Sequence, residues 1–307
     1  MELNELQRKI VKLKEEKNAL LLVHNYQIPE LQVIADHLGD SLQLARQAQQ
    51  AGDADMIVFC GVDFMAETAA VLNPDKKVIL PSISARCPMA SMLPLKVLKL
   101  AKLAQPDAQV VLYVNTLAEA KAEADVVCTS SNADRIVAQL EAKEILFGPD
   151  KNLAWYVQQR VPDKVITPVP AEGHCSVHRL FGDGSDAMKL KEQYPDAELI
   201  VHPECEPEFQ IKADYILSTG GMVKRARESN AKTFIIGTEI GLVERLRREN
   251  PEKIFLPAIK YPECAAMKRI DLENTYRALE RERPIVILPD DIIEKARVPI
   301  ERMLEMS

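Results

Sequence analysis

The chain has 307 residues, of which 47% are hydrophobic and 28% are charged, the composition of a folded protein with a sizeable core. Its net charge of −7 leaves no basic surface of the kind that binds nucleic acid. No apolar run approaches the roughly 20 residues that cross a bilayer, and the N-terminal segment is too charged for a signal peptide. We therefore expect a cytoplasmic protein with neither a nucleic-acid nor a membrane partner.

A helix is expected at the start of the chain, at about residues 2–17, with Leu3, Leu6, Ile10 and Leu13 on one face. The sequence after it repeats with a period of about 89 residues. Apolar runs at 20–27, 110–116 and 199–205 end in polar residues, and the runs at 54–61, 124–131 and 213–220 also resemble one another. Each copy later reaches a cysteine, namely Cys87, Cys175 and Cys264.

In every copy, short runs of β-branched residues alternate with helical segments, which is the pattern of a parallel sheet covered by helices. We predict an α/β fold of three αβα sandwich domains, related by a pseudo-threefold axis around a central site. The expected domains are residues 1–87 together with 282–307, residues 88–175, and residues 176–281.

The first copy differs from the other two in this interpretation. Aligning its run at 54–61 with 124–131 leaves about 19 extra residues, which we interpret as an inserted helix. It also leaves no counterpart of the strands at 144–147 and 233–236. We therefore expect a strand at 284–289 to return and complete the first sheet, followed by a helix that breaks near Pro299.

Polar residues follow the predicted strands, and ligands of such sheets bind beyond the carboxyl ends of the strands. His24, Tyr113 and His202 share one repeat position, Tyr26, Asn115 and Glu204 lie two residues further along, and Ser130 and Thr219 are another equivalent pair. If the strand ends face a common axis, these side chains form one ring. Their chemistry suits a small, oxygen-rich anionic substrate.

The six cysteines, at positions 60, 87, 128, 175, 205 and 264, are too far apart for a local zinc or iron–sulfur motif. Three of them, Cys87, Cys175 and Cys264, share one repeat position, so an axis between the domains would bring their thiolates together. That tripod suits a [4Fe–4S] cluster with one open iron, or a zinc ion with one exchangeable ligand. The spacing does not choose between them. We interpret Cys60, Cys128 and Cys205 as structural.

The segments that carry a family resemblance are VHNYQIPELQ, GDSLQLA, GVDFMAETAA, ARCPMA, YVNT, TSSNA, GHCSVH, VHPEC, STGGM and CAAMKRIDLENTY. In this order they resemble the quinolinate synthase family of NAD biosynthesis over nearly the whole chain. The resemblance implies one [4Fe–4S] cluster per chain on Cys87, Cys175 and Cys264, with the open iron acting as a Lewis acid. It also implies condensation of iminoaspartate with dihydroxyacetone phosphate to quinolinate, with transient supply of iminoaspartate by an aspartate-oxidising enzyme.

The resemblance also suggests roles for the strand-end residues, and the catalytic candidates are His24, Tyr26, Tyr113 and Glu204. His24 and Tyr26 would transfer protons near the open iron, and Glu204 would be the general base. His202 would contact a phosphate or carbonyl oxygen. Tyr113 and Asn115 would orient the substrate.

Hydroxyl groups at helix N-termini bind anions well, although the same groups also cap helices. On this basis Ser41 and Ser130 are candidate carboxylate anchors, and Ser218 and Thr219 are candidate phosphate anchors. His178, three residues after Cys175, is a weaker candidate. Glu67 is expected on a solvated helix face.

Two other functions stay open on the residues alone. A zinc-dependent lyase or hydrolase would use the same three thiolates. A non-catalytic iron–sulfur sensor would hold the cluster without turnover.

Overall fold

The computed structural model describes residues 2–307, which form three four-stranded parallel sheets, one in each copy of the repeat. The first sheet has the order β2-β1-β3-β4, with β1 at Ala19–His24, β2 at His37–Gly39, β3 at Met56–Cys60 and β4 at Lys77–Ile79. The second has the order β6-β5-β7-β8, from β5 (Gln109–Tyr113), β6 (Val126–Cys128), β7 (Glu144–Gly148) and β8 (Val165–Pro168). The third has the order β10-β9-β11-β12, from β9 (Glu198–Val201), β10 (Tyr215–Ile216), β11 (Thr233–Gly237) and β12 (Ile254–Pro257).

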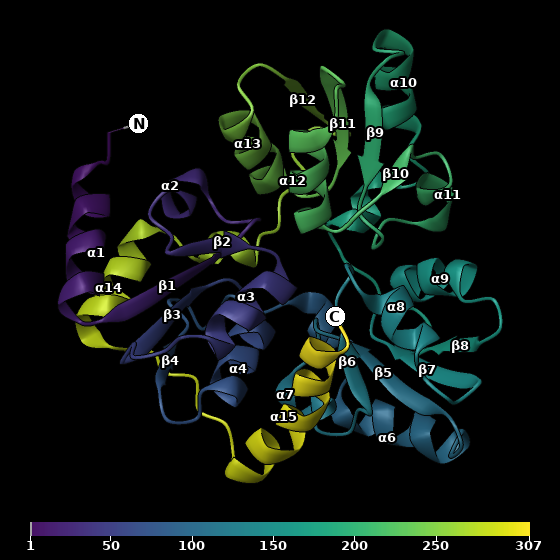
Figure 1. Ribbon diagram of the computed structural model, residues 1–307, viewed down its shortest axis with the longest axis horizontal. Helices are drawn as coiled ribbons and strands as arrows, with labels where there is room; N and C mark the ends of the chain where they lie inside the picture. The colour runs from purple at the N-terminus through teal and green to yellow at the C-terminus, as the bar shows by residue number, and fades with distance from the viewer. Residues whose placement is uncertain (1) are drawn as a thin grey trace.

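Helices flank the sheets, and the three units surround a common centre (Figure 1). After the first strand of each unit come α2 (Pro29–Gln32), α7 (Ala118–Lys121) and α11 (Pro207–Gln210), and after the second come α3 (Ser41–Gln49), α8 (Ala133–Ala138) and α12 (Thr219–Glu228). The third strands lead into α4 (Asp63–Leu72), α9 (Lys151–Arg160) and α13 (Ile240–Glu249). Beyond the fourth strands lie α5 (Pro88–Ser91), α6 (Leu95–Ala104), α10 (Ser185–Gln193) and α14 (Leu272–Arg281). The predicted architecture of three αβα units is confirmed.

The first copy of the repeat is complete, so its predicted alignment was wrong. The segment at 54–61 contains β3, the counterpart of β7 and β11, and the expected inserted helix contains β2, the counterpart of β6 and β10. A repeated acid shows the equivalence. Asp36, Asp125 and Asp214 each precede one of these short strands, and each accepts a hydrogen bond from the first strand of its own sheet, at Leu21 N, Val110 N and Leu199 N.

The C-terminal tail also differs from its prediction in two respects. Residues 284–288 do return to the edge of the first sheet, but only Ile79 and Ile285 form a bridge there, and it is antiparallel. Because β4 already fills the fourth place, no strand is missing. The last helix, α15 (Asp290–Glu305), continues through Pro299 without a break. Its buried face, with Ala296, Ile300 and Met303, packs against α4, α7 and β6, which offsets the hydrogen bond that proline removes.

The N-terminal helix α1 (Glu5–Glu16) lies where it was predicted, and it packs against α14 on the side of the first sheet. Both helices of the tail region, α14 and α15, therefore contact the first unit. The predicted domain boundaries stay a prediction. Glu67, expected to face solvent, is half-buried instead, because its carboxylate accepts from Ala118 N at 2.6 Å across the first two units.

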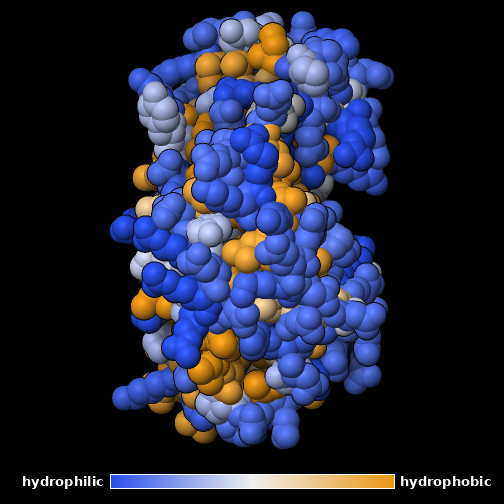
Figure 2. Space-filling model, turned by 90° about the vertical axis from the view of Figure 1, so that its left-hand side faces the viewer, coloured by the Kyte–Doolittle hydropathy of each residue, from blue (hydrophilic) through white to orange (hydrophobic). Residues whose placement is uncertain are grey.

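The apolar core is shared unequally among the units. One cluster runs through the first and second sheets, the second unit has a further cluster of its own, and the third unit has two, on either side of its sheet. Hydrophilic residues cover most of the face in Figure 2, and the hydrophobic residues on it lie in separate patches. Among residues 2–307, no helix has both the length and the apolar character that a membrane crossing requires.

Candidate active site

A cavity lies between the three units, at the carboxyl ends of their strands. Its lining includes His24, Tyr26, Ser41, Cys87, Tyr113, Asn115, Ser130, Cys175, His202, Glu204, Thr219 and Cys264. Ser218, the remaining candidate, lies outside that lining, where its hydroxyl caps α12 by accepting from Gly221 N. The parallel strands of a sheet all end on one side, so the sheets deliver these side chains to one place.

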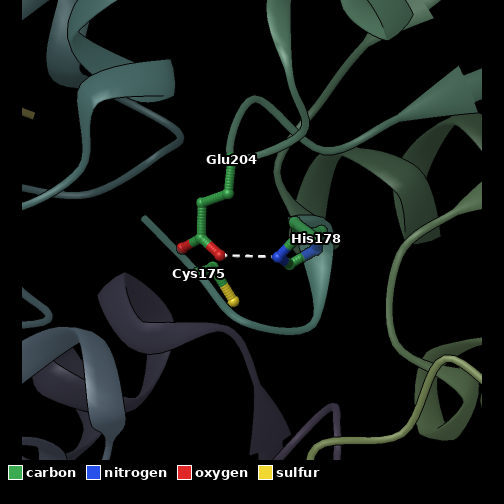
Figure 3. A group of neighbouring side chains, drawn as sticks. All are labelled: Cys175, His178 and Glu204. Carbon is green, nitrogen blue, oxygen red and sulfur yellow. Dashed lines mark ion pairs between the residues drawn. The ribbon is translucent and has the colours of Figure 1, made fainter. Parts of the chain in front are cut away.

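Several polar side chains contact the carboxylate of Glu204 in the cavity. Tyr113 donates its hydroxyl to Oε1 at 2.5 Å, and Asn115 Nδ2 lies 3.4 Å from the same oxygen. His178 Nδ1 lies 2.7 Å from Oε2 (Figure 3). Burial opposes ionisation of this carboxyl, but the neighbouring His178 and the Tyr113 hydroxyl outweigh burial and hold the pKa of Glu204 well below its usual range. Glu204 is therefore a carboxylate, able to accept a proton.

His24 and His202 have the same local geometry in two copies of the repeat. In each, Nδ1 lies close to the backbone N–H two residues later, at 3.1 Å from Tyr26 N and 3.3 Å from Glu204 N. A backbone N–H can only donate, so Nδ1 accepts and the ring proton is on Nε2. Burial lowers the pKa of both imidazoles to about 3, so both are neutral and present an Nε2–H donor.

A chain of short contacts joins Tyr26 to Glu204 through two residues that the sequence prediction did not select as main candidates. The Tyr26 hydroxyl lies 2.6 Å from Thr238 Oγ1, and Thr238 Oγ1 lies 2.9 Å from His178 Nε2. Ionised Glu204 requires the His178 proton on Nδ1, which leaves Nε2 to accept from Thr238 and the Thr238 oxygen to accept from Tyr26. Thr238 and His178 are both fully buried. Short contacts thus connect the Tyr26 hydroxyl to the Glu204 carboxylate.

Three equivalent hydroxyls face the cavity from the start of the helices. Ser41 and Thr219 are the first residues of α3 and α12, and Ser130 lies in the turn before α8. Thr219 Oγ1 also accepts from Asn25 Nδ2 at 2.9 Å. The Asn115 side-chain oxygen, which is buried without a hydrogen-bond partner, is a further polar atom in the lining. The three hydroxyls can donate to an anionic ligand with several oxygens, whereas the Asn115 oxygen can only accept.

Cys87, Cys175 and Cys264 reach the cavity from three loops, one in each copy, and all three are unpaired and partly buried. Burial raises the pKa of each thiol. Negative charge on neighbouring thiols raises the pKa of Cys87 and Cys175 further. Three thiolates are therefore unfavourable here without a cation to balance them. The donor set fits a thiolate-bound metal centre.

Comparison with known proteins identifies the family. The model of the family described as quinolinate synthetase A protein matches residues 8–305. The chain belongs to the quinolinate synthase family. Relatives named quinolinate synthase include those of Methanothermobacter thermautotrophicus, 54% identical over 99% of both chains, and Thermococcus onnurineus, 54% identical over the whole of both. That of Thermotoga maritima is 50% identical over 97% of this chain and 98% of its own. The chain is thus an enzyme of this family.

Besides the three cysteines, a second group of possible metal ligands lies in the same cavity. One atom each of Cys175, His178 and Glu204 all lie within 4.8 Å of one another (Figure 3). His178 Nδ1 and Glu204 Oε2 form a contact of 2.7 Å, but His178 Nδ1 has no hydrogen bond. The other three cysteines are buried away from the lining: Cys60 in β3, Cys128 in β6 and Cys205 just after β9.

Prediction from sequence missed several groups around the cavity of this enzyme. His178 was only a weak candidate, although its spacing of three residues from Cys175 was visible in GHCSVH. Thr238 and Asp40, which also contribute to or line the site, follow strands like the chosen residues but lack a distinctive spacing. Their contacts come from other units of the chain, which a single sequence does not reveal.

Proposed function

We propose that this enzyme condenses iminoaspartate with dihydroxyacetone phosphate to form quinolinate, one phosphate and two waters, a reaction of NAD biosynthesis. The observation that carries the proposal is the meeting of one cysteine from each copy of the repeat at a cavity that also holds Glu204 and its donors. Cys87, Cys175 and Cys264 would hold a [4Fe–4S] cluster. With one iron free of protein ligands, the cluster would act as a Lewis acid toward a substrate oxygen.

The reaction needs several proton transfers, and the buried groups are suited to them. Glu204 is ionised and takes a proton from the substrate, while Tyr113 and His178 hold its two oxygens in place. Tyr26 gives or receives a proton at the far end of the contacts through Thr238 and His178. His24 and His202 are neutral, so their Nε2–H groups donate to substrate oxygens without adding charge.

Anion binding is divided among the hydroxyl groups of the three units. Ser41 and Ser130 would anchor the carboxylates of iminoaspartate, and Thr219, with backbone N–H groups at the start of α12, would anchor the phosphate. Ser218 supports this helix start rather than contacting the substrate directly. Asn115 has an unpaired amide oxygen that can accept from a substrate hydroxyl or imine nitrogen.

A zinc-dependent lyase or hydrolase is the second candidate, because Cys175, His178 and Glu204 have the close spacing of a single-ion site. The two candidates need different residues. A cluster requires Cys87 and Cys264 but does not require His178 as a ligand. A zinc ion bound by the second group requires His178 but neither Cys87 nor Cys264.

Anaerobic purification of the full chain and four variants separates the candidates. We expect about four iron and four sulfide per wild-type chain, the content of one [4Fe–4S] cluster. Iron should be lost in Cys87→Ala and Cys264→Ala, but retained in His178→Asn and in the control Cys60→Ala. Stoichiometric zinc that disappears only in His178→Asn would refute the cluster and support the second candidate. Quinolinate formed from iminoaspartate and dihydroxyacetone phosphate is then measured by mass spectrometry.

The proposal extends to the setting of the reaction. Iminoaspartate is an imine that hydrolyses in water, so its supply would be transient, from an enzyme that oxidises aspartate. A cytoplasmic location suits six unpaired cysteines, which a reducing compartment keeps as thiols.

A further inference from the structure

Each of the three cysteines that line the cavity has an acidic residue beside its backbone N–H. Asp63, Asp150 and Glu239 follow β3, β7 and β11, the third strands of the three units. Asp63 Oδ1 accepts from Cys87 N at 3.0 Å, and Glu239 Oε1 accepts from Cys264 N at 3.0 Å. In the second copy, the backbone N–H of Cys175 faces the Asp150 carboxyl and opposes the rise that burial causes in its pKa. The same pair of neighbours thus recurs in all three copies, with a hydrogen bond in the first and the third.

The same three carboxylates also bind the start of a helix. Asp63 accepts from Phe64 N at 2.9 Å in α4, Asp150 from Leu153 N at 2.7 Å in α9, and Glu239 from Gly241 N at 2.6 Å in α13. These helices pack against the sheets through buried faces. Each carboxylate therefore links a cysteine loop to a rigid element of its own unit.

The sulfur atom of each cysteine also has a backbone N–H as a neighbour. The backbone N–H three residues later, at Ala90, His178 and Met267, faces the sulfur of Cys87, Cys175 and Cys264 respectively. Each cysteine thus has a carboxylate beside its own N–H and a backbone N–H beside its sulfur. The repeated geometry restricts where each sulfur can lie.

Capping alone does not explain these acids. Asp271 caps α14 through Asn274 N at 2.8 Å without any role for a cysteine in that contact. The surroundings of the three acids also differ. Lys268 Nζ lies 2.8 Å from Glu239, whereas Asp150 has a buried oxygen with no hydrogen-bond partner. What the three share is a cysteine N–H beside the carboxyl.

We infer that Asp63, Asp150 and Glu239 are positioning residues, which hold the three cysteine ligands at fixed places around the cavity. The inference rests on the proposed role of these cysteines as cluster ligands. Ligands fixed before the metal centre arrives lose less freedom on binding it, and misplaced ligands bind it more weakly. Asp63 is the best site for a test, because it is partly exposed while the other two are fully buried.

The first measurement needs no cluster. In the chain freed of metal, hydrogen exchange of the Cys87 amide is compared between wild type, Asp63→Ala, Asp63→Asn and the control Asp271→Ala. We expect exchange about tenfold faster in Asp63→Ala, the effect of losing one hydrogen bond to a charged acceptor. Asp63→Asn keeps an acceptor oxygen and should restore most of the protection, and Asp271→Ala should leave the Cys87 amide unchanged.

The second measurement uses the cluster-loaded chain. Iron release to a chelator should be several-fold faster from Asp63→Ala than from wild type, Asp63→Asn or Asp271→Ala. If Asp63→Ala does not fold, Asp63→Ser replaces it, since serine keeps a hydroxyl at the start of α4 but is too short to reach Cys87 N. Equal exchange and equal iron release in all variants would overturn the inference. A wild-type chain that assembles no cluster would overturn the proposed function instead, and the exchange result would still decide whether Asp63 holds Cys87.

Discussion

Replacing Lys268 by methionine should destabilise the junction between the first and third units. Lys268 Nζ lies 2.8 Å from Glu239 Oε1, and the two side chains are 15% and 0% exposed. The ammonium group also donates to the backbone oxygen of Tyr26. Methionine keeps the length of the side chain but removes the charge. Glu239 would then be a buried carboxylate with no cation beside it.

Breaking a buried ion pair costs about 3–5 kcal/mol. Glu239 keeps its bonds from Cys264 N and Gly241 N, so we take the lower end, about 3 kcal/mol. At about 2–4 °C per kcal/mol, the melting temperature should fall by about 6–12 °C. The assay is thermal unfolding of the metal-free chain by fluorescence. Lys295→Met is the control, because it removes a pair whose side chains are 61% and 64% exposed.

The loss should also depend on pH. Burial raises the pKa of Glu239 in the folded chain, and Lys268 opposes that rise. The folded state therefore binds the proton more readily than the unfolded state, so ionisation of Glu239 reduces stability as pH rises. Without Lys268 the pKa rises further, and the deficit should be larger at pH 8 than at pH 5. A variant that melts with the control at pH 8, or has the same deficit at both pH values, refutes the reasoning.

Three further predictions follow from the cavity and its loops. Gly173→Ala should lower stability by about 1–3 kcal/mol, measured by thermal unfolding, because its Cβ would lie 1.8 Å from the backbone oxygen of Pro149. Glu204→Gln should reduce turnover by about 10²–10⁴-fold with an unchanged iron content, since the proton acceptor is lost; retained turnover would remove Glu204 from the mechanism. Burial lowers the pKa of His24 and His202 from 6.5 to about 3, so the unfolded chain binds more protons between these values and stability should decline as pH falls below 6.5. Replacing both by glutamine should flatten that decline in melting curves from pH 7 to pH 4.5, and an unaltered slope would contradict it.

The repeat made most of the site predictable without a structure. Residues at one position of a repeat occupy one position in each unit, so Tyr26 and Glu204 could be placed at equivalent strand ends. The same logic grouped Cys87 with Cys175 and Cys264. What the repeat could not show was contact between units, such as that of Tyr26 with Thr238.

The first copy was misaligned because hydropathy is a weak guide to very short strands. β2 has three residues and includes His37 and Gly39, so it does not look like a strand. The reliable marker was the acid before it, since Asp36, like its counterparts, makes a specific backbone contact. The predicted helix break near Pro299 was wrong for a related reason. Local propensity favours a break at proline, but burial of one face of α15 keeps the helix continuous.

The acids beside the cysteine N–H groups, Asp63, Asp150 and Glu239, could be predicted only in part from the sequence. Asp63 precedes Cys87 by 24 residues, and Glu239 precedes Cys264 by 25. An acid after a strand and before a helix is, however, also the usual pattern of a helix cap. Only the fold tells which acids reach a cysteine.

The packing of α1 against α14 determines when the first unit can be completed during synthesis on the ribosome. Synthesis runs from residues 5–16 toward residues 272–281, so α1 leaves the ribosome before its partner α14 has been made. Until then the face of α1 that packs against α14 has no partner. Packing of the first unit is thus completed only after the third unit has been synthesised, and a stop codon near residue 270 would remove α14 and α15 from the first unit.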